Sequence, residues 1–350
     1  MDLNTIWQDY GLDRLEEGVQ QLFPKTGIST EELLARVMSG DVLGAISGLF
    51  SDIGSGFVSQ LTSMKNVLVW LLVLGIASAM VTHFVEIFDM HQVADLSFYF
   101  MYLLFTAVLL KCFSQAADTA VTTLENITVF IRLLAPAYLL SVGISGGAAS
   151  AGVACQLMLL VIYGVEYILA RGVVPFIYSY MMLSVVNGIW TEEKLTLLID
   201  LLEKGISWVL KGAVGVITGI SIFQALITPV VDSLRTSTLQ KVVSAIPGVG
   251  NVADGVVELV LGSALVIKNS IGVVLLLLML VLCGAPLLKI ALIAGLLKCS
   301  AAFMDLVSDK RITACANRVG DAGILLFKTL GTGLLLFLIS VAVVTAAGRT

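Results

Sequence analysis

One stretch of this sequence has residues at a spacing that is typical of a chemical function. It is "AIPGVGNVADGVVELVLGSALVIKNS", residues 245–270. Two glycines and an alanine in it, Gly248, Gly250 and Ala253, fit the G-x-G-x-x-G/A pattern of a dinucleotide-binding turn. Such a turn also needs a preceding strand, a following helix and an acidic residue about 20 positions further on. Instead, Pro247 precedes the first glycine, Lys268 stands near the place of the acid, and the flanking sequence is that of membrane helices. The pattern therefore does not indicate nucleotide binding, and we expect no cofactor.

The same stretch is better explained as a helix that stops and restarts. Pro247 lacks a backbone donor, and Gly248 and Gly250 permit unusual φ values, so we expect a helix to end near Ala245 and another to begin near Asn251. Irregular backbone at membrane depth is tolerated only where protein buries it or where it lines a water-filled cavity.

Two faces of the restarted helix carry distinct residues. Asp254 and Glu258 are four positions apart and share one face. A second stripe repeats every seven positions with Gly255, Gly262 and Asn269. Two interpretations stay open: the helix edges an aqueous path or contacts copies of itself, or it lies at the membrane interface with its acids in water.

Isolated charges inside apolar runs are the second set of candidate functional residues. They are Arg132, Glu166, Lys289, Lys298 and Lys328. A charge that faces lipid costs several kcal/mol, so such side chains usually face a bundle interior, a partner or water. Glu166 and Arg171, five positions apart, are candidates for an ion pair. For Lys289 and Arg132, near the ends of apolar runs, we favour snorkelling to the interface, whereas Lys298 is the hardest to explain in this way.

Sets of residues suited to catalysis are scarce. A possible metal cluster consists of His83, Glu86, Asp89 and His91, but zinc sites usually have ligands at firmer spacing. The sequence has no G-x-S-x-G, H-E-x-x-H or Walker motif. The 5 cysteines are odd in number and form no C-x-x-C, so we interpret them as reduced packing residues. We expect neither an enzyme nor a metal site.

The composition indicates a membrane protein. Hydrophobic residues make up 58% and charged residues 13%, whereas soluble proteins average about 25% charged residues. Six runs free of Asp, Glu, Lys and Arg are long enough for the ~20 residues that a helix needs to cross a bilayer. They are 66–85, 133–165, 172–191, 212–231, 269–288 and 329–348. The net charge of −5 arises before residue 67, and no basic patch suggests a nucleic-acid partner.

These runs predict an all-α, polytopic membrane protein with about eight or nine membrane helices, some broken or short. We expect residues 1–65 to form an amphipathic helical N-terminal region outside the bilayer and residues 66–350 to form the transmembrane domain. Residues 191–212, with charges among leucines, predict an interfacial helix. The spans are expected near 66–85, 94–113, 126–145, 151–170, 175–190, 212–231, 269–288, 290–305 and 322–346.

Two stretches between predicted spans contain features that break or pack helices. Small residues at four-residue spacing include Gly143, Gly147 and Ala151, and such spacing lets helices approach closely. The pair Gly146 and Gly147 is equally consistent with a flexible break. A second stretch contains Arg171, Gly172 and Pro175, which predict a helix end, a left-handed residue and a new first turn.

Four blocks of sequence resemble the stage III sporulation protein AE family. They are "IRLLAPAYLLSVGISGGAAS" (131–150), "AIPGVGNVADGVVELVLGSALVIKNSIGV" (245–273), "PLLKIALIAGLLKCSAAF" (286–303) and "SDKRI" (308–312). The resemblance runs from about residue 66 to the end, with the blocks in the same order. Members usually begin with a cleaved signal peptide, so the chain resembles a mature form in which Met1 replaces it.

The resemblance implies a function that the residues alone do not. It implies a subunit of the apparatus that joins the mother cell and the engulfed forespore, in the mother-cell membrane surrounding the forespore (the outer forespore membrane). The implied partners are membrane lipid, further copies of the chain, the other stage III sporulation A-operon proteins and stage II sporulation protein Q. An oligomeric conduit subunit is the leading hypothesis. The alternatives are a solute transporter with a site at the bilayer midplane and a non-conducting scaffold.

Overall fold

A computed structural model describes the backbone of residues 91–144, 149–190, 194–243, 250–305 and 309–346, with twelve single positions before residue 81. Side chains are described for residues 96–132, 156–190, 194–220, 222, 270, 272–280, 282–305 and 309–342, and for the same twelve positions. The predicted domain boundary near residue 65 and the predicted spans before residue 91 lie outside the continuous ranges and stay predictions.

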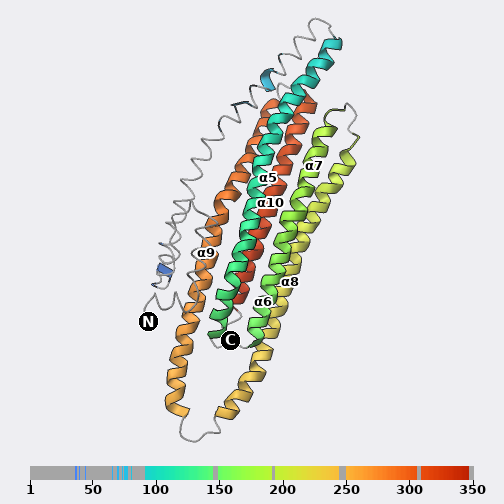
Figure 1. Cartoon of the computed structure of the whole chain (residues 1–350). Coiled ribbons are helices and arrows are strands. Elements are labelled where there is room, and N and C mark those ends of the chain that lie inside the picture. Colours follow the sequence, from blue (N-terminus) through green and yellow to red (C-terminus); the bar gives the residue numbers. More distant parts are fainter. Residues whose placement is uncertain are drawn as a thin grey trace.

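Every regular element in the described part of the chain is a helix, which confirms the predicted fold class (Figure 1). The elements are α5 (His91–Ile144), α6 (Ala149–Ile168), the π-helical turn η1 (Leu169–Val173), α7 (Val174–Asn187), α8 (Thr196–Val243), α9 (Gly250–Met304) and α10 (Lys310–Ala346). They run side by side as an elongated bundle in which α8 and α9 extend past the ends of α6 and α10.

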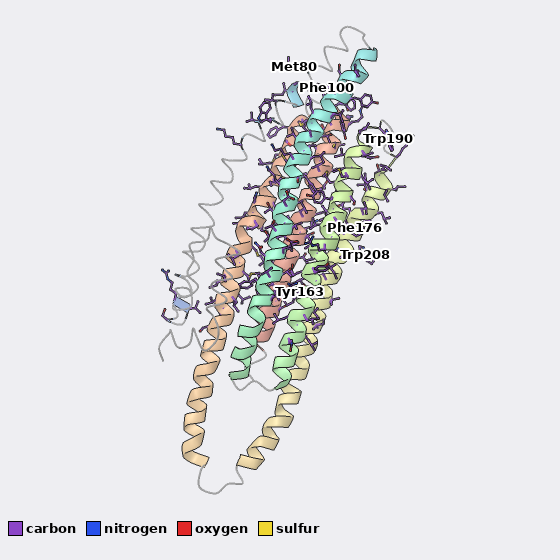
Figure 2. The ribbon with its side chains drawn as sticks, in the orientation of Figure 1. Met80, Phe100, Tyr163, Phe176, Trp190 and Trp208 are labelled. Carbon is purple, nitrogen blue, oxygen red and sulfur yellow. The ribbon has the colours of Figure 1, made fainter. Side chains whose placement is uncertain are left out.

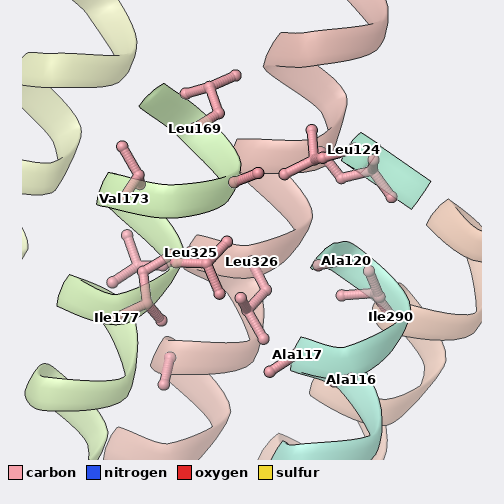
Figure 3. Packing of buried hydrophobic residues seen from close by; sticks show 14 of the residues in the cluster. Ala116, Ala117, Ala120, Leu124, Leu169, Val173, Ile177, Ile290, Leu325 and Leu326 are labelled. Carbon is pink, nitrogen blue, oxygen red and sulfur yellow. The ribbon is translucent and has the colours of Figure 1, made fainter. Parts of the chain in front are cut away.

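The helix α10 is the centre of the bundle, since it contacts α5, α6, α7, α8 and α9. Small residues on α5 allow this close packing. Ala116, Ala117 and Ala120 are fully buried near Leu325 and Leu326 of α10 (Figure 3). The rings of Phe130 and Phe337 meet edge to face at 5.9 Å between centroids.

Four helical segments in the described residues are long and apolar enough to cross a membrane. They are Leu96–Arg132, Gln156–Asn187, Gly272–Met304 and Lys310–Ala342. The predicted number of eight or nine spans is not confirmed by this set. The helix α9 is also much longer than one crossing. It has 55 residues, and such a helix is about 80 Å long against a hydrocarbon core of roughly 30 Å.

Some helices that the sequence predicted as separate are continuous. The predicted span 94–113 and residues 126–144 of the predicted span 126–145 lie within α5. The polar segment between them is helical, and its hydroxyls find their hydrogen-bond partners within the same helix. Thr119 donates to Gln115 O at 2.7 Å and Thr123 donates to Thr119 O at 2.7 Å. The segment contains no proline or glycine that would end the helix.

The predicted stop and restart at residues 171–175 is wrong. The residues that flank η1, Ile168 and Val174, both have right-handed helical dihedrals, and Gly172 has no positive φ. The Val174 N–H bonds to Leu169 O, five residues back, instead of four. Pro175 has no N–H, and in a regular helix its ring would press on the carbonyl of residue 171, so a wider turn at this point lets the helix continue.

The predicted interfacial helix at 191–212 is also not separate, because α8 continues from Thr196 to Val243. The turn from α7 into α8 is fixed by side chains. The Asn187 carboxamide oxygen accepts the Leu195 N–H at 2.9 Å, and its NH₂ donates to Thr196 Oγ1 at 3.3 Å. The Tyr102 hydroxyl donates to Val185 O at 2.6 Å, near the end of α7 where helix carbonyls lack their own partners.

The close crossing of α9 and α10 depends on Gly323, a residue without a side chain. A Cβ added at Gly323 would lie 2.9 Å from Ala294 Cβ and 3.2 Å from Ala294 Cα. We therefore expect Gly323→Ala to push the two helices apart and lower the free energy of unfolding by about 1–3 kcal/mol.

Gly295 on the same hairpin is the matched control for that substitution. A Cβ there meets nothing within 4 Å, so Gly295→Ala should leave stability unchanged or raise it by up to about 1 kcal/mol. Denaturation of both variants in the same detergent measures the difference. Equal effects would mean that the Gly323 contact does not limit the approach of α9 to α10.

Candidate functional site

Many large apolar side chains lie on the outer surface of the described helices, as expected for contact with lipid. Phe176 on α7 and Trp208 on α8 both lie on the outside, exposed at 57% and 79% (Figure 2). Leu157 and Leu160 of α6 and Leu201 of α8 are each more than half exposed. A water-soluble protein rarely exposes so extended an apolar surface. The polar residues at membrane depth must therefore be explained one by one.

An ion pair between α9 and α10 accounts for Lys298. Lys298 Nζ lies 2.6 Å from Asp321 Oδ1 and donates to Asn317 Oδ1 at 2.7 Å. The two charged side chains are about one-third exposed. The stem of Lys298 lies over Gly320, where an added Cβ would meet its Cγ at 3.0 Å. Lys298 is therefore neutralised inside the α9–α10 hairpin and does not need to snorkel.

Sequence reasoning did not single out Asp321 and Asn317, although a signal for them exists. Asp321 is the only acidic residue in the sequence of α10. In an antiparallel hairpin that turns between Met304 and Lys310, positions near 317 lie beside Lys298. An isolated lysine and an isolated acid on neighbouring apolar helices together predict an ion pair.

The predicted pairing of Glu166 with Arg171 is wrong. Arg171 instead forms an ion pair with Glu125 of α5 at 2.7 Å, and both side chains are well exposed. Five positions along a helix place two side chains on roughly opposite faces, so they cannot meet. Glu166 points into the bundle and is fully buried, and neither of its carboxylate oxygens has a hydrogen-bond partner in the part of the chain that the structure describes.

Arg132 at the end of the Leu96–Arg132 span packs on α6. Its guanidinium donates to the Tyr163 hydroxyl and lies 4.6 Å from the centre of the ring. This contact combines a hydrogen bond with a cation–π interaction. Tyr163 is labelled in Figure 2.

A groove between α8 and α10 contains Lys328. It has a volume of about 450 Å³ and is lined by Ser207, Leu210, Lys211, Val214, Lys328 and Thr332. The lining residues of α8 recur at three- and four-residue steps, and those of α10 are four apart, so each helix contributes one face. The sequence singled out Lys328 but not Lys211, because Lys211 lay in the predicted interfacial helix.

The remaining predicted site residues lie where the structure does not describe side chains. The helix α8 ends at Val243 and α9 begins at Gly250, and Pro247 and Gly248 lie between these bounds. The first turns of α9, which carry Asp254, Gly255 and Glu258, belong to the part of α9 that extends past α6 and α10 (Figure 1). The roles proposed for these residues, and for Gly250, Gly262, Lys268 and Asn269, stay predictions.

The small-residue positions are in the same situation. Gly143 lies in the last turn of α5 and Ala151 in the first turn of α6. Gly146 and Gly147 fall between the two helices, outside the described residues. Their role in packing stays a prediction. The possible metal cluster around His83 also lies outside the described side chains.

The apolar outer surface, the four apolar helices and the paired intramembrane charges are the features of a helical membrane protein. Residues 28–348 match the family model described as stage III sporulation protein AE, and the chain belongs to this family. The predicted resemblance is thereby confirmed.

A curated relative supports the same family. The chain is 23% identical over 263 residues to the protein named stage III sporulation protein AE of Bacillus subtilis (strain 168). The alignment covers 75% of this chain and 66% of the relative, just under two thirds of its length. No solved structure matches the chain significantly.

The Lys298–Asp321 pair should stabilise the hairpin. Asp321→Asn leaves a half-buried ammonium without its counter-charge. Removal of one partner costs about 3–5 kcal/mol at a fully buried pair and about 0–1 kcal/mol at the surface, so we expect a loss of about 1–3 kcal/mol here.

A double-mutant cycle with Lys298→Met separates the ion pair from the effect of each side chain. The double variant should lose less stability than the sum of the two single variants, since it leaves no unpaired charge. The free energy of unfolding in detergent is the measurement. Additive losses would show that the two charges do not stabilise each other.

Proposed function

We propose that this chain is a non-enzymatic subunit of a membrane complex required for endospore formation, and that copies of it assemble around a conduit. Membership of the stage III sporulation protein AE family supports the link to sporulation. The proposed location is the mother-cell membrane surrounding the forespore, a multi-pass arrangement in which the crossings predicted near 66–85 and 212–231 add to the four candidate spans. The proposed partners are the other stage III sporulation A-operon proteins and stage II sporulation protein Q.

The groove formed by Lys211 and Lys328 is the observation that favours a conduit subunit. Any 20-residue crossing placed within Lys310–Ala342 contains Lys328, so this lysine lies in the membrane or at its edge. Neither lysine forms an ion pair with another described side chain. Two like charges that border one groove repel each other unless water or an anionic group separates them.

An ammonium on the outer face of a bundle is costly against lipid, so water or a second subunit must cover the groove. A conduit assembled from several copies supplies both water and a second subunit, because the face with the groove can border the water-filled path or contact the next copy. Ser207 and Thr332 add hydroxyls to the groove, whereas Leu210 and Val214 supply its apolar wall. A lone transporter with its site at the midplane would instead place its polar groups inside one chain.

Replacement of both groove lysines tests the proposal in the cell. In an endospore-forming host, Lys211→Met with Lys328→Met should reduce the number of heat-resistant spores at least tenfold while the protein stays at normal levels in the membrane. Methionine keeps most of the side-chain volume and removes the charge. Lys194→Met, at the exposed turn before α8, is the matched control and should sporulate normally. Normal sporulation of the double variant would remove the groove from the proposed function.

Thiol labelling tests what covers the groove. In a cysteine-free background, Thr332→Cys should react with a charged, membrane-impermeant thiol reagent or form disulfides between copies. Leu335→Cys on the same helix, 45% exposed among apolar neighbours, should do neither because lipid covers it. If both positions stay unreactive, lipid covers the groove and the conduit arrangement is wrong.

The same labelling along residues 248–268 tests the proposed role of the first turns of α9. If these turns edge a water-filled path, positions on the Asp254–Glu258 face should label and positions on the Gly255–Gly262 face should be protected. Complete protection would favour a scaffold held together by close packing. Labelling of the whole stretch from one side would indicate a helix on the membrane surface.

A further inference from the structure

Glu166 is a carboxyl group enclosed entirely by other helices. It lies ten residues inside the Gln156–Asn187 candidate span and is 0% exposed. Neither of its oxygens has a hydrogen-bond partner among the described residues. Gly333 of α10 faces it so closely that an added Cβ would lie 2.7 Å from Oε2, 2.9 Å from Oε1 and 2.9 Å from a methyl carbon of Leu124. The carboxyl group of Glu166 is therefore tightly packed between α6, α5 and α10.

None of the cationic side chains described on the surrounding helices forms an ion pair with Glu166. Arg171 is paired with Glu125 of α5, and Arg132 of α5 lies on the Tyr163 ring. From α10, Lys328 lies in the groove against α8, where it is joined by Lys211 of that helix. From α9, the thiol of Cys283 lies in the neighbourhood of Glu166 and is itself fully buried, so it carries no charge that could neutralise the carboxyl. No described cation thus neutralises the carboxyl.

A bare carboxylate in so fully enclosed a site is too costly to persist, and a buried acid without a counter-charge is instead held in its neutral form. A metal ion does not fit the site as described. Hard cations take six or more oxygen ligands, and the described residues contain no group of three or more His, Cys, Asp or Glu side chains that could hold a metal ion. The hydroxyl of Thr329, one turn before Gly333, is already donated to Leu325 O at 2.8 Å.

We propose that Glu166 is a proton-binding site within the membrane and that its proton is coupled to the contact between α6 and α10. The carboxyl carries the proton while Gly333 packs against it. Release of the proton creates a charge that requires water, and water can enter only if α6 moves away from Gly333. The proton passes to that water, and the carboxylate remains hydrated until the helices close again. This inference rests on the surroundings of Glu166 and holds with or without a conduit.

Infrared spectroscopy of the full chain in lipid vesicles tests the first part. At neutral pH the spectrum should contain the C=O band of a protonated carboxylic acid that is absent in Glu166→Gln. The matched control is Glu125→Gln, which removes an acid that is 44% exposed and paired with Arg171, and this variant should keep the band. A spectrum without such a band, or with a band that survives Glu166→Gln, would overturn the proposal.

Labelling with a hydrophobic carbodiimide, which adds to protonated carboxyls, gives a second readout. Mass spectrometry should find the adduct on Glu166 and at least tenfold less on Glu125. If sodium ions at constant pH suppress both the adduct and the infrared band, the site binds sodium and the proton assignment is wrong.

The coupling is tested with spin labels at Leu160 of α6 and Leu335 of α10, which are 65% and 45% exposed. When rising pH removes the acid band, the distance between the labels should increase in the wild-type chain and stay constant in Glu166→Gln. A constant distance in both chains would show that the proton leaves without separation of α6 and α10, and would overturn the coupling.

Discussion

The close crossing of α9 and α10 at Gly323 is the contact on which the rest of the bundle depends. Because no side chain separates the two helices there, the Gly323 backbone approaches Ala294 directly. That approach brings Lys298 within reach of Asp321 and Asn317 further along the hairpin. Since α10 also contacts α5, α6, α7 and α8, its position against α9 affects the packing of every other described helix. Dispersion between closely packed helices is the main attraction available in lipid, where the hydrophobic effect does not drive helices together.

Four isolated charged residues of the described helices are accommodated in four different ways. Lys298 is neutralised by an acid on the next helix, and Arg132 rests on an aromatic ring. Lys328 borders a groove, whereas Glu166 is enclosed and has no hydrogen-bond partner among the residues that the structure describes. The first two arrangements stabilise the fold and need nothing from outside. The last two are incomplete within a single chain, and that incompleteness is what indicates function, because a charged group at membrane depth is retained at a cost in stability.

The sequence was sufficient to predict the class of protein, the family and which isolated charges need an explanation. It was not sufficient to predict the residues with which these charges interact. Composition predicted a helical membrane protein, and isolated charges identified Glu166, Lys298 and Lys328. The sequence did not predict that α5 continues through its polar middle, because a polar segment between two apolar runs is also typical of a loop. The structure shows instead that hydroxyls of this segment bond to carbonyls of the same helix. Nor did the sequence predict the π-helical turn η1 before Pro175, because a proline ends some helices and only distorts others, which continue past it. The partner of Arg171 depends on which helix lies beside η1, and that is a property of the whole bundle.

The two incomplete sites are joined by one helix. Gly333 faces the carboxyl of Glu166, and its neighbour in sequence, Thr332, lines the groove against α8 together with Lys328. Adjacent residues of a helix point about 100° apart, so α10 presents one face to each site. A helix this regular moves as a unit, and a separation of α6 from Gly333 therefore also shifts the wall of the groove that carries Lys328. If Glu166 releases its proton as proposed, the width of the groove between α8 and α10 changes with it. The same helix that sets the packing of the bundle thereby connects a site buried inside one chain to the surface at which copies of the chain would meet.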